Sequence, residues 1–500
     1  MKLQISKNFS VVLISVASFL LLMLPTSFLL INKDQSYATM DEPRFVIEVQ
    51  ENGLFGGIAK TITFTTNASR ANYFGVVLSD IVASVNSTPR FLRAFRVIEC
   101  FLLIAIFALF ISKFFGSSFS KAEGSIEIST FLLPCFLIVG YIAQDLPFFI
   151  FHSSVYELEA SVFLVVLLIF VFSGEPRFLL VPILVLILCL IKEPLALVAG
   201  AICTIGLAYY FFNGRKIRIE LLTGLALSIG ALLYFITLRD TGYASNYSGS
   251  PLDRVSSFFE FILSTKSLVL TLLIAPVASV FNYFLLKKKS LLAQFTTIWM
   301  ILIIPALISV VALLYAFVLY PWAGDNWPAY YYFPVRIMIK TALIIVLLPL
   351  FWVIVDTVKG RYNARNLGLV FLVLIGAYQV FHYNRDVFNL MEHSLDNRRV
   401  GNLIAKWHAQ LNSIPYFYAH SNEVALRLNQ SQRLLDHGVG FMFKNLSSLK
   451  MAEDCWNRNL CRFLVIEDYI FRPEYAQFDQ TAGVLTVKTP FYLLFVKPSN

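Results

Sequence analysis

An acidic pair, Asp41-Glu42, follows the first long apolar run of the sequence and has the residue types that proton transfer requires. One carboxylate can accept a proton from an attacking hydroxyl while its neighbour orients a metal ion or a sugar hydroxyl. A long polar segment also carries acids simply because it lies in water. The pair alone leaves both roles open.

Two cations further along the chain interrupt apolar stretches. Lys192 is the centre of the segment Leu-Ile-Lys-Glu-Pro at 190–194, and Arg336 ends an aromatic segment that contains Tyr331 and Tyr332. Such cations can bind an anionic group. The alternatives are a lysine that pairs with Glu193 at an interface, an arginine that flanks a span, and a tyrosine belt at a membrane surface.

The composition indicates the elements that position these residues. Of 500 residues, 58% are hydrophobic and 14% are charged, and the mean hydropathy is +0.70. These values predict an all-α polytopic membrane protein. The net charge of +9 arises from short Lys and Arg clusters between apolar runs. No basic stripe with base-stacking aromatic residues is present, so we expect no nucleic-acid partner.

Apolar windows of about twenty residues predict about eleven transmembrane helices. They lie near 9–31, 97–115, 129–147, 160–174, 177–192, 194–212, 219–238, 267–286, 295–320, 338–357 and 366–382. Residues 1–383 therefore form a transmembrane domain, with a first outer loop at 33–96. Residues 384–500 form a small α/β domain, in which 463–466 and 483–487 alternate as strands do.

The distribution of basic residues predicts orientation. With the N-terminus inside, clusters such as 287–289 fall in cytoplasmic loops, as the positive-inside rule requires. The acidic first loop and the C-terminal domain then face outward. The predicted location is the plasma (inner) membrane, with an extracytoplasmic active site and C-terminal domain.

Other residues with chemical potential give weaker signals. Asp145 and His152 lie in the second outer loop and are secondary candidates for an acceptor or metal site. Cys455 and Cys461 are the two cysteines in a polar region, and their spacing is compatible with a disulfide or with free thiols. The sequence identifies no metal ligand set with certainty, and a divalent cation remains open as a cofactor.

The order of these motifs resembles the C-type glycosyltransferase superfamily, which includes protein O-mannosyltransferases and the aminoarabinose transferases that act on lipid A. Asp41-Glu42 matches the acidic pair after the first span, and 190–194 resembles the Leu-Thr-Lys-Gly/His-Pro turn of the family. The segment 330–336 resembles an aromatic and basic stretch before a late span. Glu193 departs from the pattern, since many relatives have a small residue there.

The resemblance implies a function for each match. The donor would be a sugar on a polyprenyl phosphate, and its transfer to an acceptor hydroxyl would invert the anomeric carbon. Asp41 would be the base with Glu42 as its partner, while Lys192 and Arg336 would bind the donor phosphate. A glycan, lipid or protein acceptor and membrane lipids would be the partners.

Two other classes share the many predicted spans. A lipid-glycan polymerase or ligase would be expected to carry a large late outer loop, whereas this chain has its long loop first. A flippase or transporter of lipid-linked glycan would be expected to show charges within its spans or repeated halves, and the sequence shows no repeated halves.

Overall fold

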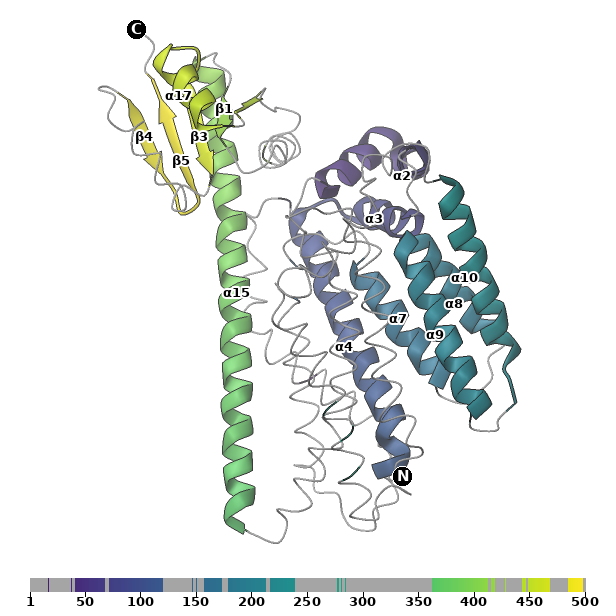
Figure 1. Cartoon of the computed structure of the whole chain (residues 1–500). Helices are drawn as coiled ribbons and strands as arrows, with labels where there is room; N and C mark the ends of the chain where they lie inside the picture. Colours follow the sequence, from purple (N-terminus) through teal and green to yellow (C-terminus); the bar gives the residue numbers. More distant parts are fainter. Residues whose placement is uncertain are drawn as a thin grey trace.

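The structure is a computed structural model that describes ten segments of the chain and a few single positions between them. The segments are 41–67, 72–119, 157–172, 179–212, 216–238, 362–411, 415–418, 443–446, 448–467 and 484–497. They form a helical bundle, one long helix and a small sheet (Figure 1).

The bundle contains seven of the described helices. In chain order they are α2 (Asp41–Asn67), α3 (Tyr73–Val85), α4 (Pro89–Phe119), α7 (Glu157–Phe172), α8 (Leu180–Ile191), α9 (Glu193–Phe212) and α10 (Ile219–Leu238). Figure 1 shows α2 and α3 across the end of the bundle where α4 begins. Helices α7 to α10 are apolar around most of their circumference, and their facing side chains form one continuous core with α4.

Small residues allow α9 and α10 to approach closely. A Cβ atom on Gly200 would lie 2.3 Å from the Ser228 hydroxyl, and that hydroxyl donates a 2.5 Å hydrogen bond to the carbonyl of Ala196. A larger residue at 200 would therefore push α10 away. The backbone contact also satisfies a hydroxyl that is buried between two apolar helices.

Helix α2 consists of two helical halves that meet at Gly53. This glycine has φ 68° and ψ 172°, values that lie outside the helical region. Only glycine adopts such a conformation without strain, because it has no Cβ atom. The bend lets both halves of α2 pack on α3, which is shorter and straight.

The C-terminal part contains α15 (Tyr362–Leu411), α17 (Leu449–Asn457) and a mixed five-stranded sheet. The strands are β1 (Tyr416–Tyr418), β2 (Lys444–Asn445), β3 (Phe463–Glu467), β4 (Leu485–Lys488) and β5 (Tyr492–Val496), in the order β2-β1-β3-β5-β4. β1 is parallel to β2 and β3, whereas β5 is antiparallel to β3 and β4. The predicted strands at 463–466 and 483–487 overlap β3 and β4.

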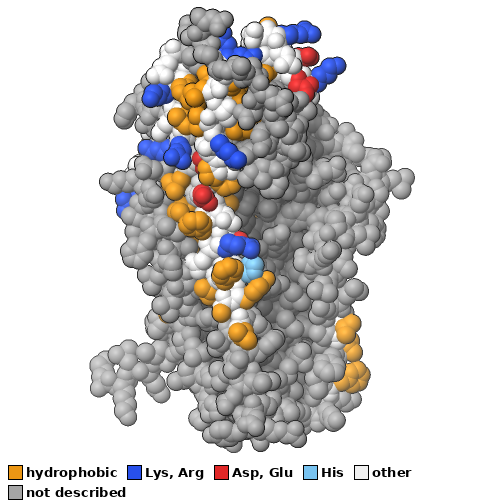
Figure 2. All heavy atoms as spheres, turned by 90° about the vertical axis from the view of Figure 1, so that its left-hand side faces the viewer, with side chains coloured by type: hydrophobic (Ala, Val, Ile, Leu, Met, Phe, Trp, Pro, Cys, Tyr) orange, Lys and Arg blue, Asp and Glu red, His pale blue; other side chains and the backbone are white. Residues whose placement is uncertain are grey.

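Helices cover both faces of this sheet. Val400 and Ile404 of α15 pack on the face that presents Phe463 and Val465. The opposite face presents Leu464 and Ile466 to α17 and buries Trp456, among other residues. Both faces are buried, so β3 is apolar at four consecutive positions. Further toward its N-terminus, α15 exposes apolar side chains at one surface, beside charged ones (Figure 2).

The structure contradicts the predicted membrane architecture for the residues that it describes. None of the helices in these segments combines the length and the apolar composition that crossing a membrane requires. Helix α8, predicted as a span over 177–192, has 12 residues and is therefore about 18 Å long, against about 30 Å of hydrocarbon. The prediction of an all-α polytopic fold with about eleven spans is corrected accordingly. So is the predicted plasma-membrane location with an extracytoplasmic domain.

Candidate functional site

The candidate site lies at the end of the bundle that α2 and α3 cover. Helices α4 and α7 both begin there, and Arg96, near the start of α4, pairs with Glu159 at the start of α7. α8 returns toward this end, so the junction between α8 and α9 also lies there, and α3 packs against α8. The predicted acidic pair and the predicted phosphate-binding lysine are thus carried by elements at one end of the molecule.

Asp41 and Glu42 form the first turn of α2. Tyr37, four residues before this helix, is buried, and its hydroxyl donates a 2.8 Å hydrogen bond to the carbonyl of Ser87. Ser87 lies in the short link between α3 and α4, and its hydroxyl also accepts a hydrogen bond from Gln50. Tyr37, and Gln50 of α2, are therefore both bonded to the residue that precedes α4 by two positions.

Asp80 is a buried carboxylate on the side of α3 that packs against α2. Its side chain is fully buried, and neither carboxylate oxygen has a hydrogen-bond partner. The pKa of Asp80 is raised from 3.8 to about 6, chiefly by burial; Thr61 and Arg44 act to lower it, and the neighbouring Glu48 acts to raise it. Thr61 lies close enough to affect the pKa, yet its hydroxyl makes no hydrogen bond either.

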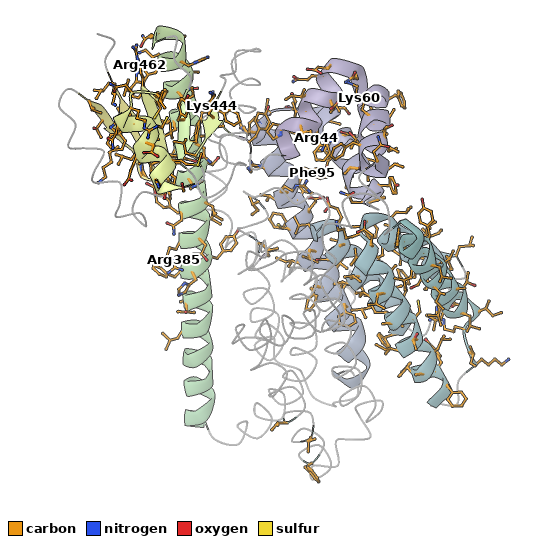
Figure 3. The ribbon with its side chains drawn as sticks, turned by 45° about the horizontal axis from the view of Figure 1, so that its top comes forward. Arg44, Lys60, Phe95, Arg385, Lys444 and Arg462 are labelled. Carbon is orange, nitrogen blue, oxygen red and sulfur yellow. The ribbon has the colours of Figure 1, made fainter. Side chains whose placement is uncertain are left out.

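Arg44 of α2 acts on this carboxylate at longer range, as does Glu48, whose own partner is Lys60. The Arg44 guanidinium lies over the ring of Phe64, 3.6 Å from its centroid, which joins the two halves of the bent helix. Lys60 pairs with Glu48 at 3.5 Å. Figure 3 shows Arg44 and Lys60 on α2, on the same end of the bundle as Phe95 of α4. Asp80 thus lies within electrostatic reach of the Arg44 guanidinium without an ion pair to it.

The start of α4 contributes a buried charge network. The Arg96 guanidinium donates a 2.7 Å hydrogen bond to Glu99 and a 3.0 Å hydrogen bond to Glu159. Burial raises the pKa of Glu99 well above its ordinary value, against the opposite effect of Arg96. Arg93, one turn earlier, is also fully buried. Arg96 further lines a small pocket between α2, α3 and α4, with Phe45, Val46, Ser79, Val82, Ala83, Leu92 and Phe95.

Lys192 is the single residue between the apolar helices α8 and α9. Its backbone is extended, with φ −163° and ψ 142°, and its carbonyl accepts the hydrogen bond of Leu195 that starts α9. Proline is tolerated in the first turn of a helix, so Pro194 explains why α9 begins here. The Lys192 side chain is only 2% exposed, and its ammonium lies 3.7 Å from a Glu193 carboxylate oxygen. Its burial makes it unlike a lysine that extends into water.

The structure describes some of the site residues that the sequence predicts and does not describe others. It describes the backbone of Asp41 and Glu42 and the whole of Lys192. Arg336, Asp145, His152, Tyr331 and Tyr332 lie outside the described residues. Within the described segments, no group of three or more His, Cys, Asp or Glu side chains is arranged to hold a metal ion.

Sequence reasoning missed Asp80. It is the one acidic residue within α3, which otherwise has strongly apolar character. That contrast is the signal that could have identified it, because a carboxylate in an apolar helix is costly unless it has a use. Its burial depends on α2 packing over α3, which the sequence did not reveal.

Comparisons with known proteins identified no relative of this chain. No protein-family model matches the chain, and no curated protein or solved structure matches it significantly.

Proposed function

We propose that this protein is a glycosyltransferase that moves a sugar from a polyprenyl-phosphate donor to an acceptor hydroxyl, with inversion. The observation that carries the proposal is Asp80, a fully buried carboxylate without a hydrogen bond. It lies on α3, which packs against α2, the helix that begins with Asp41, and against α8, the helix that Lys192 follows. A base, a hydrogen-bond acceptor and a cation are then available at one end of the bundle.

The chemistry assigns a separate role to each residue. The acceptor oxygen attacks the anomeric carbon and forms the new bond, while the bond from that carbon to the phosphate oxygen breaks and its electron pair leaves with the phosphate. Asp41 takes the proton of the attacking hydroxyl. Lys192 stabilises the negative charge that grows on the departing polyprenyl phosphate.

Asp80 supplies hydrogen-bond acceptors for the bound sugar. An ionised carboxylate has two oxygens that only accept hydrogen bonds, and sugar hydroxyls are matching donors. At a pKa of about 6, most Asp80 carboxyls are ionised near neutral pH. Reaching this residue requires the two halves of α2 to move apart from α3, and Gly53 is the position at which α2 already bends.

Donor binding can be tested with farnesyl phosphate, a short and soluble analogue of the polyprenyl-phosphate product. A charge-assisted contact contributes roughly 1.5–3 kcal/mol, so Lys192→Ala should weaken binding by about 10- to 150-fold. Lys192→Arg should restore only part of it, because the guanidinium is larger and forked. Arg385→Ala is the matched control, since Arg385 is an exposed cation on α15 (Figure 3).

Equal binding by Lys192→Ala and Arg385→Ala, with intact folding by thermal denaturation, would remove Lys192 from the donor site. In a second assay, the protein is incubated with a panel of polyprenyl-phosphate sugars and simple alcohol acceptors. The anomeric configuration of the product is then determined by NMR. Inverted product supports the proposal. Retained configuration, or transport of the donor without transfer, would contradict it.

A further inference from the structure

The C-terminal end of α17 brings two cysteines together. After α17, Asn459 adopts the left-handed conformation with φ 53°, which asparagine tolerates better than most residues. The N–H of Leu460 donates to the carbonyl of Cys455 at 2.9 Å, and that of Asn459 donates to Trp456 at 3.2 Å. This pair of bonds is a Schellman motif, and it turns the chain back toward the helix.

The turn places Cys461 beside Cys455. The N–H of Cys461 also donates to the carbonyl of Cys455, at 3.1 Å. Both cysteines carry free thiols in the structure, and this hydrogen bond brings their backbones together, as the short distance between the Cα atoms of a disulfide requires. Both residues are buried in the same apolar cluster between α17 and the sheet, and their thiols lie within hydrogen-bond reach of one another.

A lysine adjoins this pair. The Lys497 ammonium donates to the carbonyl of Trp456 and, at 2.7 Å, to the side-chain oxygen of Asn459. It also lies 4.3 Å from the centroid of the Trp456 ring. Burial raises the pKa of the Cys461 thiol, and Lys497 acts in the opposite direction. The pKa of Cys461 stays raised overall, so the thiolate, the form that attacks a disulfide, is a minor species and exchange at this pair is slow.

We infer that Cys455 and Cys461 form an intramolecular disulfide that joins the end of α17 to the start of β3. The oxidant is a small-molecule disulfide. The thiolate of Cys455, the more exposed of the two, attacks it and releases one thiol, and the thiolate of Cys461 then displaces the second. The two cysteines lose two electrons and two protons, which the small disulfide takes up as two thiols.

Trypsin provides a direct test on the full-length protein. It cleaves after Lys450, Arg458 and Arg462, so Cys455 lies on peptide 451–458 and Cys461 on peptide 459–462. The folded protein is equilibrated with oxidised and reduced glutathione, quenched with acid, alkylated and digested without reduction. The expected result is a linked pair of these two peptides in most molecules at an oxidising ratio, lost when the digest is reduced.

Recovery of both peptides alkylated across the whole range of glutathione ratios would overturn the inference, as would a link from Cys455 to another cysteine. Cys189 and Cys203 are an internal control, because they are buried near each other on antiparallel helices without a backbone hydrogen bond. They should remain alkylatable after denaturation. The Cys455→Ser variant should abolish the linked peptides, and the result on the unaltered protein decides the question even if that variant folds poorly.

Discussion

Two buried aspartates, Asp80 in the bundle and Asp396 in α15, differ in what surrounds them. Asp396 accepts a 2.8 Å hydrogen bond from the Thr489 hydroxyl and a 3.1 Å bond from the backbone N–H of Phe491. These bonds fasten α15 to the turn between β4 and β5. Asp80 accepts no hydrogen bond at either oxygen. Burial raises the pKa of both carboxyls, so the difference lies in their bonding and not in their burial.

Asp396 therefore has a structural role, because its hydrogen bonds hold α15 on the sheet, whereas Asp80 has oxygens that can still accept hydrogen bonds from a ligand. A buried polar group without a partner costs stability, and folded proteins rarely keep one without a use. The next residue along α15, Asn397, also bonds to the sheet, since it accepts a 2.5 Å hydrogen bond from the Tyr492 hydroxyl of β5. The α2–α3 end of the bundle is therefore where a ligand is expected, and the junction of α15 with the sheet is where rigidity is expected.

The largest expected effect is on catalysis at the α2–α3 end. Removing a general base lowers rates by about 10²- to 10⁴-fold, so Asp41→Asn should reduce the initial rate of sugar transfer by that amount and leave the thermal midpoint unchanged. Asp396→Asn is the control at the other end. It should lower stability and leave the rate per folded molecule intact. Equal activity in the Asp41→Asn and unaltered proteins would end the proposal that Asp41 is the base.

A large effect on stability is expected from Arg96, whose network joins α4 to α7. Arg96→Ala leaves Glu99 and Glu159 buried without their shared cation, which should cost about 3–5 kcal/mol in the free energy of unfolding. Denaturant titration of the two proteins measures this difference. A loss below about 1 kcal/mol would mean that water or other groups compensate the two carboxylates.

The pH dependence of stability should report Asp80. Its pKa is near 3.8 when unfolded and about 6 when folded, so its contribution is favourable below pH 4 and is lost as the pH rises through 6. The loss approaches about 3 kcal/mol, since each unit of pKa difference corresponds to about 1.4 kcal/mol. The difference in unfolding free energy between the unaltered protein and Asp80→Asn, measured from pH 4 to 7, isolates this residue from Asp396. A constant difference would contradict the raised pKa.

The smallest expected effect is on the stability of the contact between Asp396 of α15 and the turn that joins β4 to β5. Thr489→Val removes the hydroxyl that donates to Asp396 and also accepts the N–H of Tyr492 at 3.0 Å. Each such hydrogen bond contributes about 0.5–1.5 kcal/mol, so chemical denaturation should show a loss of about 1–3 kcal/mol with unchanged sugar transfer. A change in the transfer rate would mean that the two regions are coupled.

Parts of this organisation could be predicted from the sequence and others could not. The β3 strand was predictable because an apolar run flanked by polar residues has few other uses. The break at Lys192 was predictable because Pro194 starts a helix more readily than it continues one. The bend at Gly53 and the burial of Asp80 were not, since both depend on how α2 lies over α3. Composition led to a membrane prediction that the described helices contradict.

The central claim, that Asp80 is kept for a ligand and not for stability, is tested most directly by Asp80→Asn. Thermal midpoint and transfer rate are measured on the same samples at pH 7.5. We expect the variant to be at least as stable as the unaltered protein, because a desolvated charge has been removed, and to transfer sugar at least about tenfold more slowly. A variant that is less stable and fully active would contradict it.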